Sequence, residues 1–467
     1  MRFITIIACV LTATPALAQQ ETTLGAEFRL EGEAIKEDCK SFKTFVSCAS
    51  TLVTNHPVHV AIGSIAPQNG FGFGPAIVAE RPIGENWRFS WSGDAVGATG
   101  GAWRAGAYLK MVRTGVRLPN PAAAGAGSDA SAGIHPYPVF NIYAQHISLP
   151  TVSYFGIGPD TTTSTKSIFG LKHAIVGAST IYPITALGRL NLSVVGEANG
   201  RFVDVGGADS DKGPSIDRLF TERTAPGLTT QPGFAQFGEG VRLMPRLATG
   251  RVRLNYLATL QQFLAASDSS YSFRRWTVDL SHEFALYKTV APPMSRDANG
   301  PNQCAANPGD SRCPPIIPPA ASRNYTGSIG FRLLASKSGV SSGNVVPFYF
   351  QQTVGGSDIN GNRILPSYDD YRFRGPHLLV LQESFEHSLF KTPVGIWLAA
   401  DQGKVARQED SLTFDNLLHS YTFGLTLRAG GFPAVIASWS TGGTEGHHFA
   451  FTISTSLLGG SARPSLQ

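Results

Sequence analysis

The chain has 467 residues, a formal net charge of +5, and basic residues that are scattered along its length. A charge this small and dispersed excludes the basic surface of a nucleic-acid-binding domain, so we expect no nucleic-acid partner. Charged residues make up 15% of the chain, and 51 Gly, 30 Pro and 28 Phe stand against 4 Met, a composition that disfavours helices and an ordinary soluble domain and favours strands.

The first segment, residues 1–18, has the organisation of a secretory signal peptide. Arg2 provides the positive start, Phe3 to Leu11 the apolar centre, and Ala16-Leu17-Ala18 the small-residue cleavage site. The apolar run is too short to span a bilayer as a helix. A lipoprotein signal ending at Cys9 is the alternative, although it would leave an apolar region of only a few residues. We therefore expect the chain to be exported.

Residues 19–55 are polar and weakly periodic, and we predict a periplasmic N-terminal arm here. The cysteines that remain after the signal form two close pairs in polar surroundings, Cys39 with Cys48 and Cys304 with Cys313. In an oxidising compartment such pairs indicate two short disulfide-closed loops. A metal site is the alternative, but the usual Cys-x2–4-Cys spacing is absent and no histidine lies between the partners. We expect no metal and no cofactor.

From about residue 56 the chain becomes a series of alternating segments. In 275–287 one face carries Trp276, Val278, Leu280, Phe284 and Leu286, and the other carries Thr277, Asp279, Ser281 and Glu283. The segments 251–265, 420–430 and 448–458 alternate in the same way, and this period of two predicts strands with two different faces. Further predicted strands are 70–80, 86–96, 101–113, 138–148, 166–182, 187–205, 233–247, 325–338, 344–354, 377–390, 394–401 and 432–440.

These segments give about sixteen strands, many of them longer than the ~5–6 residues usual in soluble sheets. Short turns at 430–431 and 441–446, and long connections at 114–137, 206–232 and 290–323, suggest turns at one end of a barrel and loops at the other. A soluble propeller, β-helix or pair of sandwiches is the alternative, but no repeat of fixed length is visible. We predict an all-β transmembrane antiparallel barrel over residues 56–460, followed by a C-terminal tail, 461–467.

One constellation adds a family resemblance. The chain carries Gly355-Gly356-Ser357 before a long loop, Arg372-Phe373-Arg374-Gly375 on that loop, and Asp401-Gln402-Gly403 on a following strand. With the phrases "GFGFGPAIVAERPIGENWRFSWSGDA" and "YFGIGPDTTT" (154–163), this pattern resembles the BamA/TamA family of outer-membrane barrels, also called bacterial surface antigens, over roughly residues 56–458. The strand count places the arginine loop between the eleventh and twelfth strands, as in that family.

The resemblance implies that residues 357–376 fold back into the lumen and that an arginine there meets an acidic residue of the inner wall. Arg374 is the first candidate and Arg372 the second, with Asp401 as the partner and Phe373 packed on the wall. Gly403 lies near Asp401 on the same strand. The alternative is that both arginines lie at the membrane edge with their charges in water.

The resemblance also implies a function. It suggests a protein that inserts or exports proteins at the outer membrane of a Gram-negative cell, with lipid and client outer-membrane proteins as partners. Only about 37 residues separate the predicted signal from the barrel, too few for a periplasmic POTRA module, so either a separate periplasmic partner delivers clients or the activity of the family has been lost. A small-solute pore and a structural surface antigen are the alternatives. We predict a monomer and no enzyme, because no catalytic Ser/His/acid set has a supporting context.

Overall fold

The computed structural model describes residues 58–84, 86–113, 138–184, 190–208, 210–245, 252–286, 289–290, 322–323, 327–389, 394–429, 432–443, 445–453 and 464–466. The barrel strands are β1 (Val58–Ser64), β2 (Phe71–Ile83), β3 (Trp87–Ala98), β4 (Trp103–Arg113), β5 (Val139–Tyr154), β6 (Ser167–Pro183), β7 (Leu192–Gly207), β8 (Phe234–Leu243), β9 (Val252–Ala265), β10 (Phe273–Ala285), β13 (Gly327–Val340), β16 (His377–Ser388), β17 (Val394–Ala406), β18 (Leu418–Ala429), β19 (Phe432–Thr441) and β20 (His447–Ile453).

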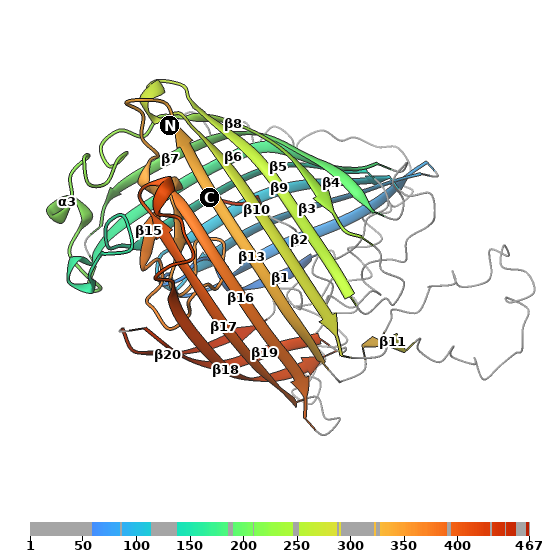
Figure 1. Ribbon diagram of the computed structural model, residues 1–467. Coiled ribbons are helices and arrows are strands. Elements are labelled where there is room, and N and C mark those ends of the chain that lie inside the picture. Colours follow the sequence, from blue (N-terminus) through green and yellow to red (C-terminus); the bar gives the residue numbers. More distant parts are fainter. Residues whose placement is uncertain are drawn as a thin grey trace, which may run out of the picture.

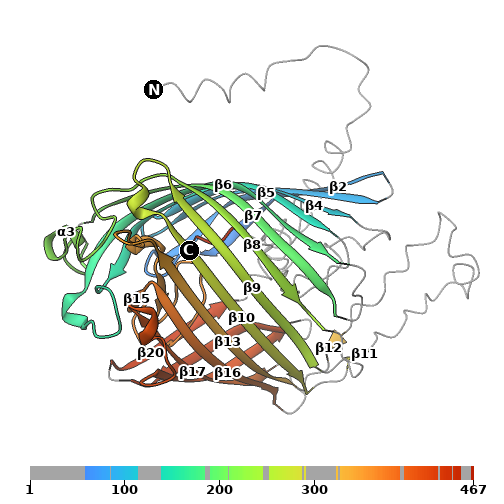
Figure 2. The same cartoon turned by 45° about the horizontal axis from the view of Figure 1, so that its top comes forward.

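These strands form one sheet of 16 strands in which each pairs with its neighbour along the chain. All the pairings are antiparallel, as expected for strands joined by hairpin connections. The sheet curls around an interior, with the blue N-terminal strands and the red C-terminal strands at its two borders (Figures 1 and 2). Within the described residues, pairing runs from β1 to β20 without joining these two strands to each other.

The shorter elements lie in the connections between barrel strands. They are the helix α3 (Ile216–Leu219), the 3-10 turns η3 (Thr163–Thr165), η5 (Ser269–Tyr271), η6 (Phe348–Phe350) and η7 (Glu409–Ser411), and the pairs β11 (Thr289–Val290) with β12 (Ser322–Arg323) and β14 (Gln352–Val354) with β15 (Phe373–Gly375). None of the described helices is long and apolar enough to cross a membrane.

The strands place their apolar residues on the outside of the sheet. Large apolar side chains are widely exposed along the outer faces of β10, β18 and β20: Trp276, Val278, Phe284, Tyr421, Phe423, Leu425, Leu427, Phe449 and Phe451. The intervening residues point inward, as shown by Arg275 on β10, which bonds the carbonyl of the buried Phe350. The alternation predicted from the sequence is therefore present, with the apolar face outward as in barrels that face lipid.

The predicted number of barrel strands is correct only because two errors cancel: the prediction includes one segment that is not a barrel strand and omits one that is. Residues 344–354 do not form a barrel strand, because Phe348–Phe350 make a 3-10 turn that is buried inside the sheet. The first barrel strand is β1, Val58–Ser64, which is too short to show much alternation. The N-terminal border of the sheet is therefore β1 and not the segment 70–80, whereas the C-terminal border, β20, overlaps the predicted segment 448–458.

The connections also distribute differently from the prediction. Successive antiparallel strands place their connections at alternate ends, so 114–137 and 290–323 join strands at the same end as the short connections 84–86 and 430–431. The connection 208–233 lies at the other end, which is called the loop end here. Chain order alone decides at which end a connection lies. Long and short connections therefore occur at the same end of the sheet, and the predicted separation of short turns from long loops is wrong.

Candidate functional site

The connection between β13 and β16, residues 341–376, is the candidate functional site and is called the lumenal loop below. It joins the eleventh and twelfth strands of the sheet, as predicted. Its strands β14 and β15 pair antiparallel, with Thr353 opposite Arg374, so the loop doubles back on itself. Its buried part begins at Val346, eleven residues before the predicted start at 357.

The predicted loop start, Gly355-Gly356-Ser357, is the tight turn that follows β14. Gly355 and Gly356 have φ values of 102° and 59°, a backbone region that favours glycine. A Cβ atom on Gly356 would lie only 2.7 Å from the backbone nitrogen of Asp370. The Ser357 amide donates a hydrogen bond to Asp370 Oδ1 at 2.8 Å. The two glycines therefore allow the two arms of the loop to pass each other closely.

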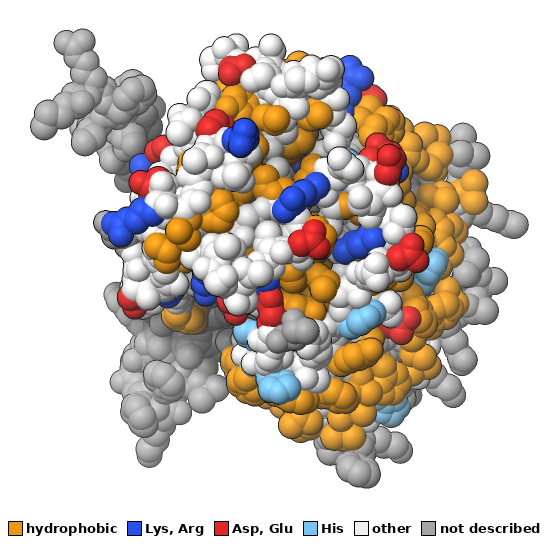
Figure 3. Space-filling model, turned by 60° about the vertical axis from the view of Figure 1, so that its left-hand side comes forward, with side chains coloured by type: hydrophobic (Ala, Val, Ile, Leu, Met, Phe, Trp, Pro, Cys, Tyr) orange, Lys and Arg blue, Asp and Glu red, His pale blue; other side chains and the backbone are white. Residues whose placement is uncertain are grey.

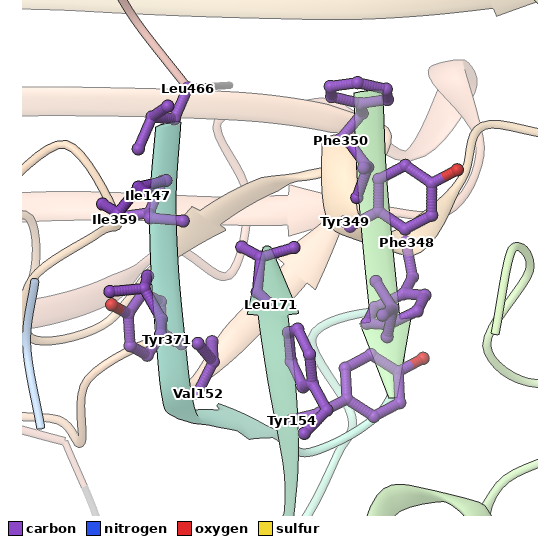
Figure 4. Close-up of a cluster of buried hydrophobic side chains, with 14 of the residues drawn as sticks. Ile147, Val152, Tyr154, Leu171, Phe348, Tyr349, Phe350, Ile359, Tyr371 and Leu466 are labelled. Atoms are coloured by element: carbon purple, nitrogen blue, oxygen red, sulfur yellow. The ribbon is translucent and has the colours of Figure 1, made fainter. Parts of the chain in front are cut away.

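An aromatic segment, Phe348–Phe350, anchors the loop in the interior (Figure 4). The Phe348 ring lies 5.1 Å from that of Phe169 on β6, and the Phe350 ring lies 5.0 Å from Phe234 on β8 and 5.3 Å from Phe263 on β9. Both residues are almost completely buried. Offset and edge-on aromatic contacts of this kind add to the stabilisation from burial alone, so this segment fixes the loop against the wall formed by β6–β9.

Two buried arginines hold the backbone of the same segment. Arg374 Nη1 donates a hydrogen bond to the Phe348 carbonyl at 2.7 Å, and Arg275 Nη2 on β10 donates to the Phe350 carbonyl. The Arg374 guanidinium also lies 5.8 Å from the Phe348 ring centroid. Arg374 belongs to the loop and not to a barrel strand, and burial lowers its pKa to about 10. It therefore remains charged at neutral pH.

Arg372 joins three separate parts of the loop end. Its Nε bonds both carboxylate oxygens of Glu445, at 2.8 and 2.7 Å, and Nη2 bonds Glu445 Oε1 at 2.5 Å. Nη1 bonds Thr161 Oγ1 at 2.8 Å, and Nη2 also bonds the Thr161 carbonyl at 2.6 Å. The guanidinium lies 4.9 Å from the Phe155 ring centroid and 4.3 Å from that of Phe373. The lumenal loop is thereby tied to the β5–β6 connection and to the β19–β20 hairpin.

The predicted pairing of Arg374 or Arg372 with Asp401 is wrong. Asp401 Oδ2 accepts the Leu365 amide at 3.1 Å, and Oδ1 accepts Gln382 Nε2 at 3.1 Å. Arg372 instead bonds Glu445 and Thr161, and Arg374 bonds the Phe348 carbonyl. At Asp401 the inner wall on β17 therefore meets the earlier arm of the loop.

Phe373 lies between the two arginines in the sequence and packs against the inner wall. It belongs to a buried cluster with Val380 on β16 and Val405 on β17, and its ring lies 5.3 Å from that of Tyr368. Gly375 brings the loop close to the wall, since a Cβ atom there would lie 3.0 Å from the Ala406 carbonyl oxygen. The predicted packing of Phe373 on the inner wall is thus present.

Gly403 also lies on β17, two residues after Asp401 and on the same face of the strand. A Cβ atom on Gly403 would lie 3.0 Å from the Leu379 carbonyl oxygen and 3.2 Å from Val380 Cγ2. Glycine therefore keeps the inner wall flat next to the loop.

The inner wall beyond the loop is polar and partly open. A cavity of about 370 Å³ lies beside the loop, lined by Ser281, Glu283, Arg332, Arg363, Gln382 and Asp401, among others. Arg332 forms a bidentate pair with Asp279, at 3.0 and 2.8 Å. Such side chains can hold water and small polar molecules, but among the described residues no group of three or more His, Cys, Asp or Glu is arranged to hold a metal ion.

The loop end is covered by side chains (Figure 3). Charged side chains of both signs are dispersed over this face, while the hydrophobic ones gather along the flank of the sheet. The mixture of charges agrees with the small net charge of the chain and gives no single-sign surface for a charged partner.

Three parts of this site were missed at the level of the sequence. Glu445 lies in a short turn, and nothing in the neighbouring sequence marks its carboxylate as the acceptor for Arg372. Thr161 lies in the quoted phrase "YFGIGPDTTT" but was not singled out. The apolar run around Phe348–Phe350 was assigned to the wall, because periodicity cannot separate a buried turn from a short strand.

The predicted disulfides lie outside the part of the chain that the structure describes. Cys39 and Cys48 belong to the predicted N-terminal arm, and Cys304 and Cys313 belong to the connection 290–323. Neither pairing, Cys39 with Cys48 or Cys304 with Cys313, is tested by the structure, so both stay predictions. The predicted signal segment, residues 1–18, and the arm, residues 19–55, lie outside the described residues as well.

A scan against protein-family models finds no match, and neither does a search of the curated proteins. Among solved structures the chain is similar to CdiB from Acinetobacter baumannii (TM-score 0.46, 11% identity, covering 84% of this chain and 58% of that one) and CdiB from Escherichia coli (TM-score 0.48, 12% identity, 83% and 58%). It is also similar to BamA from Haemophilus ducreyi lacking POTRA domains 1–3 (TM-score 0.45, 10% identity, 84% and 68%).

The chain thus spans less than two thirds of the length of either CdiB chain. At sequence identities of 10–12%, these similarities concern the fold alone. BamA, one of the two proteins after which the family suggested by the sequence motifs is named, is among the solved structures to which this chain is similar.

Proposed function

We propose that this protein is an outer-membrane β-barrel that inserts or exports client proteins, and that the lumenal loop plugs its interior. The exposed apolar outer face and the polar inner face support a membrane barrel, because lipid requires the first and an enclosed lumen allows the second. The proposal includes no catalytic step.

The observation that carries the proposal is the bond between Arg372 and Glu445. Glu445 lies in the hairpin between β19 and β20, and β20 borders the sheet. A plug bonded to the hairpin of a border strand couples the state of the lumen to the state of that border. An ordinary pore has no need of this coupling.

In this proposal the client protein binds to a border strand of the sheet. The backbone of an edge strand offers unpaired N–H and C=O groups to another strand, and an extended client segment can add to it by β-augmentation. β20 is only seven residues long and pairs with β19 over those seven. In this proposal a client strand pairs with the β20 border, and movement of the lumenal loop accompanies its passage.

The test is client folding in proteoliposomes. Purified protein is reconstituted into vesicles, a urea-unfolded outer-membrane porin is added, and the folded porin is followed by its heat-modifiable mobility on gels. We expect faster porin folding than in empty vesicles, and slower folding for the variant Arg372→Ala. Equal folding in loaded and empty vesicles would overturn the proposed function.

A small-solute pore is the second candidate, and the polar cavity of about 370 Å³ beside the loop favours it. Vesicle swelling in sugars of increasing size separates the two functions. A pore predicts rapid swelling by the unmodified protein. A plugged assembly barrel predicts slow swelling together with client folding.

A further inference from the structure

A second segment of the chain, Pro464–Leu466, also lies inside the barrel. Leu466 is 6% exposed and belongs to the large buried cluster of the lumen. It lies beside Ile147 of β5 and Ile359 of the lumenal loop (Figure 4). An apolar pocket formed jointly by the wall and the loop therefore holds a leucine side chain.

The same segment is held by its backbone. Arg201 Nη2, on β7, donates a hydrogen bond to the Ser465 carbonyl at 2.8 Å. The Leu466 amide donates to Asn360 Oδ1, on the lumenal loop, at 2.8 Å. One donor and one acceptor thus bind the two polar groups of the single peptide bond between Ser465 and Leu466, which is a mode of recognition that depends little on side chains.

Arg201 belongs to a built site and not to a chance surface contact. It is 1% exposed, its Nε donates to Gln236 Oε1, and its guanidinium lies 5.9 Å from the Phe263 ring centroid. Its Nη1 is buried and has no hydrogen-bond partner among the described residues. A buried guanidinium with an unfilled donor favours a ligand that brings acceptors into the lumen.

We propose that this place is a binding site for an extended peptide, occupied at rest by the chain's own Pro464–Leu466 segment. The ligand is a segment that offers a carbonyl to Arg201, an amide to Asn360 and a leucine-sized apolar side chain to the pocket. Because Asn360 belongs to the lumenal loop and Arg201 to the wall, the bound peptide bridges the two. An incoming peptide of the same form would displace the resident segment.

This inference goes beyond the proposed function, because such a site would exist whether the barrel transports proteins or passes solutes. The test therefore measures binding and not transport. A fluorescein-labelled peptide with the sequence of residues 461–466, Ser-Ala-Arg-Pro-Ser-Leu, is titrated with purified full-length barrel in detergent, and its anisotropy is recorded. The protein is compared with the variant Leu466→Asp, whose buried charge removes the resident side chain from the pocket.

We expect the peptide to bind Leu466→Asp at least about tenfold more tightly than the unmodified protein, because its competitor has left. A peptide in which leucine is replaced by aspartate should not bind. Adding Asn360→Ala to Leu466→Asp should weaken binding about fivefold, as the loss of one hydrogen bond predicts.

The matched control is Asn344→Ala. Asn344 lies in the same connection and bonds the Ser269 and Ser272 carbonyls, away from this site. It should leave peptide affinity unchanged. Absent or sequence-independent binding to Leu466→Asp, in a variant that keeps the heat-modifiable mobility of a folded barrel, would overturn the inference. The binding measurement does not involve client folding, so a negative result in the client-folding experiment would not affect this inference.

Discussion

Arg372 is bonded through all three nitrogens of its guanidinium. Breaking one side of such a buried pair leaves an uncompensated charge, which costs far more than the pair contributes as a whole. The bonds to Glu445 and Thr161 join loop, wall and hairpin at one side chain. At the scale of single residues, this contact decides whether the lumenal loop is held in place.

We predict that Arg372→Ala lowers the free energy of unfolding by roughly 3–5 kcal/mol. Glu445→Ala should also destabilise, and the double variant should cost less than the sum of the two, since the residues share one contact. Urea unfolding of vesicle-inserted protein, followed by tryptophan fluorescence, gives these values. The control is Lys172→Ala, which removes an exposed pair with Asp204 and should cost less than about 1 kcal/mol. Additive losses for Arg372 and Glu445 would refute the pairing.

The sequence located these arginines but not their partner. The motif around Arg372–Gly375 is local, so the loop that carries it could be recognised. Glu445 lies 73 positions further along and is brought near only by the closing of the sheet. An acidic residue on a wall strand, Asp401, was the simpler choice from the resemblance, but its oxygens are used by Leu365 and Gln382.

At the scale of elements, the aromatic turn Phe348–Phe350 holds the lumenal loop to the wall. We predict that Phe350→Ala lowers the free energy of unfolding by roughly 3–5 kcal/mol, the cost of a large cavity in a packed core. The matched control is Phe451→Ala on the outer face, where the residue is 62% exposed and little packing is lost. Urea titration of both variants provides the comparison, and equal losses would show that the loop is not packed against the wall.

A second element-scale prediction concerns the connection between β7 and β8. Glu222 accepts hydrogen bonds from the Gly227 and Thr229 amides and the Tyr271 hydroxyl. Burial raises the pKa of this carboxyl, but the hydrogen bonds outweigh that effect and leave it below the ordinary value of 4.5. A carboxyl of this kind stabilises the fold above its ordinary pKa, and the contribution is lost as the pH falls through the lowered value.

The unmodified protein should therefore lose more stability than Glu222→Gln between neutral pH and about pH 3. The measurement is the urea midpoint at both pH values for both proteins. Asp211→Asn, on the same connection, serves as the control and should follow the unmodified protein. Identical pH dependence in Glu222→Gln and the unmodified protein would contradict the assigned hydrogen bonds.

Strands were predictable because alternation is a local property. The segment 275–287 shows it clearly, and β10 occupies nearly the same residues. β1 was missed because seven residues give too little pattern, and the run ending in Phe348–Phe350 was misassigned because it is buried on all sides. Tertiary burial, not local preference, decided that element.

At the scale of the whole molecule, a 16-stranded sheet surrounds a lumen that contains two segments of its own chain. One is the lumenal loop, which connects β13 and β16. The other is the Pro464–Leu466 segment, which contacts the loop at Asn360. The outer face is apolar and the inner wall is polar. This arrangement agrees with the proposal that the lumenal loop plugs the interior.

The most direct test of the plug is single-channel conductance in a planar bilayer. We predict a small, flickering conductance for the unmodified protein and a larger one for Arg372→Ala, because the loop is no longer held. Arg407→Ala is the matched control, since Arg407 is an exposed arginine of the loop end that bonds only the Ile157 carbonyl among the described contacts. A large, steady conductance of the unmodified protein that Arg372→Ala leaves unchanged would contradict a plugged barrel.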